Sequence, residues 1–311
     1  MDCKKVLLFS FVCVSGYLSA LSHCTEIENS FSPHFTVRGD LLYWIPEVSG
    51  LDVNFGSGSS INTTLAGITT VTSTETDVDP SFQWNAGYRI ALGWQFDKNN
   101  WEVGALWTGF QGYGYKSTNL GKWKVRLKQL DLAALYNTCL SPVSLQPFIG
   151  FRGASIFQNL SSQIVTEVIF PGVGTATDTR NFQDHEQFYG IGPLFGLNSN
   201  YAVKNGLSFY GNVALGLFYG NYHLHFNDSE VVTSPATPNQ IYSTVNKTMQ
   251  AFDFNLDLAL GIQWDHLINN ACYLTMKLGI ENHQYFNQSR LGYAFGNLSF
   301  SGGIFSLGLA F

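Results

Sequence analysis

The amino-acid sequence predicts an all-β fold, a transmembrane antiparallel up-and-down β-barrel of about ten strands, or about 12 if long connections hide more. Three observations predict it: a composition rich in aromatic residues and poor in charge, long segments of alternating polarity, and connections that alternate between short and long. Of the 311 residues, 12% are charged and 15% are aromatic, whereas an average soluble domain is about 25% charged. Disordered chains instead have few aromatic residues and many charged ones.

The charge balance argues against a nucleic-acid partner. The chain has 16 Lys and Arg residues against 22 Asp and Glu residues, a net charge of −6. Nucleic-acid-binding proteins instead carry a surface patch of Lys and Arg residues. We therefore expect no nucleic acid among the partners.

The N-terminus has the pattern of an export signal. Lys4 and Lys5 precede an apolar run over residues 6–18, and small residues follow at Ala20 and Ser22. Such a run is too short to span a bilayer, which favours a cleaved signal peptide over an anchor helix. A lipoprotein-type site ending at Cys24 is a weaker alternative. The sequence thus predicts a signal peptide (1–22), a short periplasmic segment (23–33) and an outer-membrane barrel (34–311).

Three cysteines remain after this predicted cleavage: Cys24, Cys139 and Cys272. Their spacing fits no metal-binding motif. Because Cys139 and Cys272 both lie beside predicted short turns, a bridge between them is possible in an oxidising compartment.

Long stretches of the sequence alternate strictly between apolar and polar residues. In residues 82–97 and 251–265, every second residue is apolar, and the interleaved set is mainly Gly, Asn, Gln, Asp and Arg. Successive side chains of a strand point to opposite faces, so each segment is a strand with one apolar and one polar face. The ten predicted strands are 34–45, 82–97, 101–115, 125–138, 146–157, 186–203, 207–220, 251–265, 271–285 and 300–311.

The connections between these strands alternate in length. Short ones, including a hairpin signal at Asn205-Gly206, are followed by long ones such as Pro46–Ser81 and Asn159–His185. This alternation is typical of outer-membrane barrels, with short periplasmic turns and long outer loops. Ser60–Ser73 or Ile164–Thr175 could hold further strands.

Strand length and aromatic placement favour a membrane barrel over a soluble barrel or sandwich. The predicted strands exceed the usual five or six residues, and aromatic residues gather near strand ends, as in the girdles of membrane barrels. The predicted girdle residues are Tyr43, Trp44, Phe82, Trp84, Trp94, Phe96, Trp101, Tyr113, Tyr115, Tyr219 and Trp264.

Several segments resemble one known family. The opening segment Phe35–Trp44 (FTVRGDLLYW) resembles the first strand of the Legionella major-outer-membrane-protein-like pore-forming family, the MOMP-like porins of Legionella and chlamydia-related bacteria. Phe148–Arg152, Gly190–Pro193 and Gly279–Gln288 agree in the same order, and the chain ends on Phe311, like the assembly signal of outer-membrane proteins. The resemblance spans about 35–311. It implies an outer-membrane pore and no catalytic residues.

The expected function is a porin-like channel for weakly selective passive diffusion of ions and small hydrophilic solutes. Four cations and five carboxylates in the predicted lumen leave one excess negative charge, which favours cations weakly. Glycines predicted to face the lumen, such as Gly87 and Gly190, would leave space for a pore. Alternatively, the opposite charges pair and plug a narrow ten-stranded barrel. The predicted pore-lining residues are Arg38, Asp40, Arg89, Asp131, Arg152, Asp253, Asp257, Lys277 and Glu281.

A second function class is a non-conducting envelope or adhesin barrel that acts through its outer loops. Ser57–Thr76, Ile164–Arg180 and Val231–Thr248 are rich in small polar residues, and loops of this kind can carry binding functions. The expected partners are the lipid bilayer and lipopolysaccharide of the outer membrane, small solutes, a host surface, and further copies of the chain in a homo-oligomer.

We expect no enzymatic activity, cofactor or metal. Protease-type chemistry would need paired acids and a His near the outer rim. Asp184-His185-Glu186 lies at about that level, but charged residues at a loop edge are usually only solvated. His223 and His225 share a strand face and could hold a transition metal only with a third ligand.

Overall fold

The computed structural model describes residues 35–49, 81–96, 100–115, 121–140, 142–170, 174–233, 239–269, 272–290 and 296–311. The predicted signal peptide, the segment 23–33 and the range Ser60–Ser73 lie outside these residues, so the predictions made for them stay predictions. In the described part of the chain, no helix is both long and apolar enough to cross a membrane.

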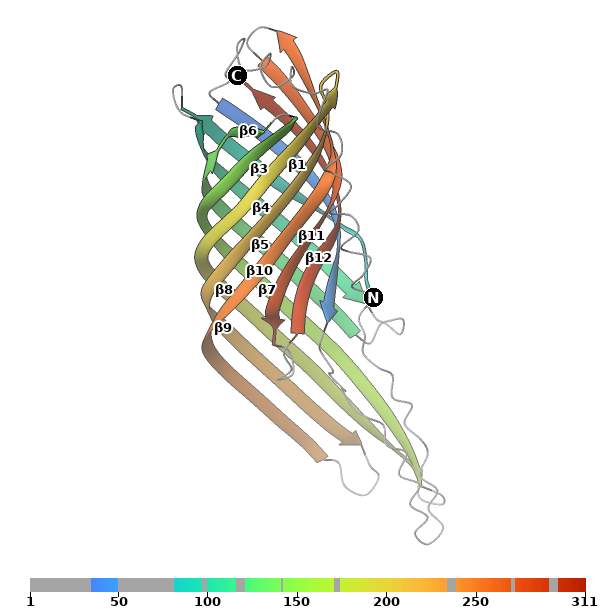
Figure 1. Cartoon of the computed structure of the whole chain (residues 1–311). Coiled ribbons are helices and arrows are strands. Elements are labelled where there is room, and N and C mark those ends of the chain that lie inside the picture. The colour runs from blue at the N-terminus through green and yellow to red at the C-terminus, as the bar shows by residue number, and fades with distance from the viewer. Residues whose placement is uncertain are drawn as a thin grey trace, which may run out of the picture.

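Ten long antiparallel strands close into a barrel, which confirms the predicted fold class (Figure 1). Each long strand pairs with its sequence neighbour, and β1 also pairs with β12, which closes the sheet. Two short strands, β2 (Ser81–Phe82) and β6 (Thr138–Leu140), pair only at the ends of β4 and β7. The long strands are β1 (Phe35–Ser49), β3 (Asn85–Gln95), β4 (Trp101–Tyr115), β5 (Gly121–Tyr136), β7 (Val143–Phe170), β8 (Gly174–Lys204), β9 (Leu207–Thr233), β10 (Asn239–Asn269), β11 (Cys272–Ser289) and β12 (Gly296–Ala310).

The first and last strands meet in a seam along the barrel wall. Fourteen register pairs join β1 to β12, from Thr36↔Ala310 to Ser49↔Asn297. At the end of the seam, the backbone N–H of Phe35 donates to the carbonyl of Phe311, and that of Phe311 donates to Phe35, both at 2.9 Å. The Phe311 ring lies 5.4 Å from that of Phe35, so the last residue is part of the closed wall.

The hairpin predicted at Asn205-Gly206 is present. Both residues have positive φ, 55° and 78°, as a two-residue type I′ turn requires. A Cβ on Gly206 would lie 2.1 Å from the carbonyl oxygen of Asp265. Only glycine fits this turn.

Strands β7 to β10 are much longer than the sequence predicts. They have 28, 31, 27 and 31 residues, and most of Ile164–Arg180 and Val231–Thr248, predicted to be loops, is strand. The described residues of Ile164–Thr175 add no further strand, because they belong to β7 and β8. Outside the bilayer neither face of a strand needs an apolar surface, so the alternation that reveals a membrane strand disappears there. The four strands project well beyond the barrel at the end of the long connections (Figure 1).

The two barrel faces follow the predicted alternation. On β10, Phe252 and Leu260 are exposed on the outside, whereas Asp253, Asn255 and Asp257 are buried inside. Most predicted girdle residues are exposed; these are Tyr43, Trp84, Trp94, Phe96, Trp101, Tyr115, Tyr219 and Trp264.

The prediction for Trp44 is wrong. Its side chain is fully buried inside the barrel, whereas Tyr43 is exposed on the outside. Neighbouring residues of a strand must face opposite sides, and Trp44 shares its face with Arg38 and Asp40. Phe82 also packs against the interior cluster, with its ring 5.4 Å from that of Trp123. The possible Cys139–Cys272 bridge is absent, because Cys139 is disulfide-bonded while Cys272 is free.

We predict that Trp44→Ala lowers the free energy of unfolding by about 3–5 kcal/mol, the usual effect of removing a buried aromatic side chain. Tyr43→Ala is the matched control on the outer face, where only a ring stack with Trp84 is lost, so we expect a loss of about 1 kcal/mol. Urea titration of the folded barrel in lipid, read by its heat-dependent gel migration, measures both. Equal losses would contradict the inward placement of Trp44.

Candidate functional site

The nine predicted lining residues all face the barrel interior, where most form ion pairs rather than a free ring of charges. Asp40, Arg89, Asp131, Arg152, Asp253, Asp257 and Glu281 are all less than 10% exposed. Three groups result, one around Arg89, one around Arg152 and one around Asp253. Lys277 stands apart from them, with its Nζ 5.3 Å from the centre of the Tyr210 ring.

Arg89 of β3 joins carboxylates from two other strands. Its Nη1 lies 3.1 Å from Oε2 of Glu281 on β11 and 3.6 Å from Oδ2 of Asp40 on β1. Asp40 also accepts a hydrogen bond from Nε of Arg38 at 3.0 Å. The indole N–H of Trp44 donates to Glu281 at 2.9 Å, so the carboxylate of Glu281 is held from two sides.

Arg152 of β7 forms the second group. Its Nε and Nη2 donate to the two carboxylate oxygens of Asp131 on β5, both at 2.7 Å. Its Nη1 donates to Asp257 on β10 at 2.5 Å. A bidentate guanidinium–carboxylate pair is among the stronger polar contacts in proteins. Here it ties strands on two sides of the lumen.

His283 links these two groups, and the sequence analysis missed it. Its Nδ1 lies 2.8 Å from Asp257 and its Nε2 lies 3.4 Å from Glu281. Only the doubly protonated ring can donate to both carboxylates. The signal was available, because His283 follows Lys277 and Glu281 in the same alternating phase of β11. With His283, a continuous chain of charges crosses the barrel from Arg38 to Asp131.

An aromatic layer lies next to this chain of charges, toward the outer end of the barrel. Its rings meet across the lumen: Phe110 of β4 lies 5.4 Å from Phe300 of β12, and Tyr285 of β11 lies 6.4 Å from Phe218 of β9. The Tyr285 hydroxyl donates to Gln129 of β5, on the opposite wall, at 2.6 Å. Further members of the layer are Trp44, Phe188, Tyr222, Leu127 and Ile156.

The inward glycines do not leave open space for a pore. A Cβ on Gly87 would lie 2.9 Å from the ring of Phe110, and one on Gly190 would lie 2.3 Å from the ring of Phe188. The space that these glycines leave is therefore occupied by the aromatic layer.

The inner half of the barrel, on the side of the short turns, contains a cavity of about 520 Å³. Its polar lining includes Arg38, Glu102, Gln146 and Lys277. Gln146 donates to Glu102 at 3.0 Å and to Asn137 at 2.7 Å. Arg89, Arg152, Asp257 and Glu281 also line the cavity, so it ends at the chain of charges.

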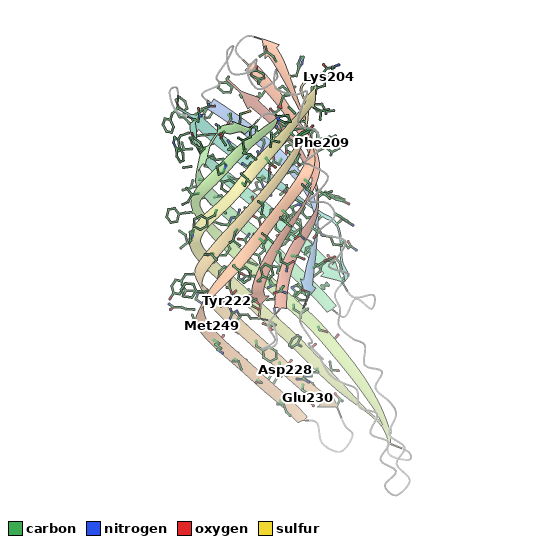
Figure 2. The ribbon with its side chains drawn as sticks, in the orientation of Figure 1. Lys204, Phe209, Tyr222, Asp228, Glu230 and Met249 are labelled. Atoms are coloured by element: carbon green, nitrogen blue, oxygen red, sulfur yellow. The ribbon has the colours of Figure 1, made fainter. Side chains whose placement is uncertain are left out.

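At the outer mouth, the end of β11 folds inward. Gln288, Ser289 and Arg290 are all buried. The backbone N–H of Arg290 donates to Oε2 of Glu186 at 2.8 Å, and its guanidinium lies 4.1 Å from the Tyr222 ring centre and 3.2 Å from Asp253. Figure 2 shows Tyr222 and Met249 at the level where β9 and β10 leave the barrel.

The two alternative chemical sites are not assembled in the described residues. Asp184 and Glu186 are buried inside, whereas His185 is on the opposite face of β8, with its ring 4.6 Å from that of Phe157. Among the residues that the structure describes, no group of three or more His, Cys, Asp or Glu side chains is arranged to hold a metal ion. His223 and His225 contact Thr248 and Asn246.

The contact between Glu186 and Arg290 should depend on pH. Glu186 lies outward of Tyr189, beyond the membrane-spanning part of β8, and burial raises the pKa of its carboxyl to about 8, against the opposing effect of the Arg290 N–H. The pKa of the Glu186 carboxyl in the folded protein thus lies above its ordinary value. The contribution of this carboxyl to stability is therefore fully present below about pH 4.5 and is lost as the pH rises through about 8.

We therefore predict that the amides of residues 288–290 lose hydrogen-exchange protection between pH 6 and pH 9, after correction for intrinsic exchange. Glu186→Gln should remove this dependence while keeping protection at the low-pH level. Hydrogen exchange read by mass spectrometry measures it, with amides of β4 as the internal control. Unchanged pH dependence in Glu186→Gln would contradict the assignment.

Comparison with known proteins identifies the family. No curated protein matches the sequence. Among solved structures, the chain is similar to the outer membrane protease OmpT of Escherichia coli (11% identity, 90% of this chain and 97% of that chain, TM-score 0.38). It is also similar to a major outer membrane protein of Thermus thermophilus (13%, 75% and 98%, 0.31) and to the P. putida toluene transporter TodX (10%, 91% and 91%, 0.35). The family model for the Legionella pneumophila major outer membrane protein precursor matches residues 30–301. The chain therefore belongs to the Legionella major outer membrane protein family and is a β-barrel of the bacterial outer membrane.

Proposed function

We propose that this protein is a closed-lumen outer-membrane barrel, not an enzyme, that works at the cell surface through the sheet formed by the outer parts of β7 to β10. The observation that carries the proposal is the filled lumen. A hydrogen bond between opposite walls, from Tyr285 to Gln129, lies beside ion pairs that join β3 to β11 and β7 to β10. A hydrated solute would have to break these contacts to pass.

The projecting sheet supports a role at the surface. Thirteen register pairs, from Gly220↔Ala251 to Val232↔Asn239, continue the β9–β10 hairpin beyond the barrel, a length of about 40 Å. Among the described residues, pairing of β10 with β11 ends at Phe254↔Phe286, so the outer part of β10 is an edge of the described sheet. Sheet edges can bind an extended segment of another protein by adding a strand. Ile241 on this part of β10 is 52% exposed.

A second candidate is the expected weakly selective channel, and one observation favours it. The inner cavity of about 520 Å³ ends at a chain of paired charges, and ion pairs can rearrange more readily than a covalent wall. Such a channel would conduct only after Arg89, Arg152 and His283 change partners and the rings of the aromatic layer move apart. The two candidates differ in whether the resting barrel conducts.

We predict that the purified, folded protein gives no conductance steps above baseline in planar bilayers, because the ion pairs and the aromatic layer together close the lumen. A 16-stranded porin in the same lipid is the positive control, since barrels of that size enclose an aqueous channel. Steady conductance with a preference for cations would contradict the closed-lumen proposal and support the channel.

We also predict that shortening the β9–β10 hairpin abolishes attachment to host cells and leaves the barrel intact. The variant replaces residues 227–244 by an Asn-Gly turn, which keeps Tyr222 and Met249 in the barrel, and attachment of bacteria that display each protein is counted on cultured host cells. A variant shortened by the same number of residues in the β7–β8 hairpin is the control that keeps the β10 edge. Heat-dependent gel migration checks folding. Equal attachment by the shortened and full-length proteins would contradict the surface role.

A further inference from the structure

Four cations follow one another on the outer face of β5. Lys122, Lys124, Arg126 and Lys128 occupy every second position, while the residues between them, such as Val125, are buried inside. Successive residues of a strand alternate between faces, so all four basic side chains lie on the outer wall of the barrel.

These cations have no carboxylate partner among the described residues. Instead, Nζ of Lys124 lies 5.7 Å from the ring centre of Tyr113 on β4, and the Arg126 guanidinium lies 5.3 Å from that of Phe157 on β7. The residues that pair in register with the four cations are Tyr115, Tyr113, Gln111 and Gly109 on β4, and Ser161, Asn159, Phe157 and Ser155 on β7. Within the part of the chain that the structure describes, the row is therefore a positive surface without a paired carboxylate, bordered by aromatic, hydroxyl and amide groups.

The row begins where the apolar belt of the barrel ends. Leu130 and Leu132 are the next residues of β5 on the same outer face as the cations. They are 40% and 51% exposed and face the hydrocarbon. Lys128 follows directly, on the side of the long connections. That side is the outer one in barrels of this kind, which places the four cations at the headgroup level of the outer leaflet.

A groove of about 780 Å³ runs from this row into the apolar belt. Its polar end includes Arg126, Lys128 and Ser155, and its apolar end includes Trp107 and Ile191. Gly153, which pairs in register with Leu130 and Ile191 at the apolar end, leaves the groove open, since a Cβ built there would meet no atom within 4 Å. The groove thus joins a cationic end at headgroup level to an apolar end at acyl-chain level.

We propose that this surface binds a phosphorylated glycolipid of the outer leaflet. Its phosphates pair with Lys124, Arg126 and Lys128, its sugar hydroxyls bond to the side chains of β7, and one acyl chain lies in the groove across Gly153. Phosphate suits the row because guanidinium and ammonium groups are its preferred ligands in proteins. A lipid suits it better than a soluble phosphate, because the groove continues into the belt.

The test measures lipid binding to the folded, full-length barrel in nanodiscs by native mass spectrometry, with diphosphorylated lipid A as the probe and its dephosphorylated form as the reference. We expect tighter binding of the phosphorylated form. Each basic side chain at an anionic lipid surface contributes about 1 kcal/mol, about fivefold in affinity. Lys124→Gln/Arg126→Gln should therefore weaken binding about 25-fold. The control Lys204→Gln/Lys247→Gln removes two cations elsewhere and should change it less than twofold; Figure 2 shows Lys204 near the opposite end of the barrel.

A second pair of variants tests the groove without changing charge. Gly153→Leu fills the open position and should lower lipid binding at least fivefold. Gly39→Leu is the matched control, because Gly39 is on the outer face of β1 and its added Cβ also meets nothing within 4 Å. Heat-dependent gel migration confirms that each variant is folded.

Three results would overturn the proposal: equal binding of phosphorylated and dephosphorylated lipid, equal loss in the Lys124→Gln/Arg126→Gln variant and its control, or displacement of the lipid by an equal concentration of inorganic pyrophosphate. The last result would identify a soluble phosphate as the ligand. None of them depends on whether the lumen conducts, so the proposed function is tested separately.

Discussion

The chain of ion pairs across the lumen is the constraint on which the rest of the structure depends. Charges inside a narrow barrel are removed from bulk water, so each needs a partner of opposite sign. Arg89, Arg152 and His283 meet this need for four carboxylates from four strands. Because a slip of one residue would turn every side chain of a strand to the other face, these pairs fix the register of the wall as well as its interior. The same inward strand positions carry the aromatic layer, which begins at the next inward positions of β1, Leu42 and Trp44.

This layered interior separates the two ends of the molecule. The inner end holds a cavity, the middle holds paired charges, and the outer part holds the aromatic layer, with the buried polar contacts of Glu186 and Arg290 at its mouth. Such an order suits a barrel whose wall is a rigid support. The described parts of β7 to β10 then extend the wall on one side only, and their strands are held by the same ladder of hydrogen bonds that crosses the membrane.

Much of this architecture is predictable from alternation alone. Strict period-two patterns gave the ten strands, their order and the inward face of all nine charged residues, because a lipid-facing wall leaves no other arrangement. Pairing partners were not predictable: Arg152 meets Asp257 over 105 positions of sequence, and only the closure of the sheet brings them together. The girdle prediction for Trp44 is wrong because it rests on the residue type alone. Trp44 is an even number of residues from Arg38 and Asp40 and therefore shares their inward face. The alternation does not predict the outer halves of β7 to β10, because a strand with water on both faces has no polarity pattern. The alternation along β11 is enough to place His283 inside the barrel. The alternation along β8 likewise puts His185 on the face opposite to Asp184 and Glu186, because His185 is adjacent to both.

The seam between β1 and β12 has a consequence for biogenesis. The backbone groups of Phe35 are satisfied by the final residue of the chain, and a strand edge left open in hydrocarbon is costly. Without β12, the facing edges of β1 and β11 would both stay unpaired, however well the other strands have formed. In the cell, closure of the wall must therefore wait until β12 has been made, whichever other strands pair first.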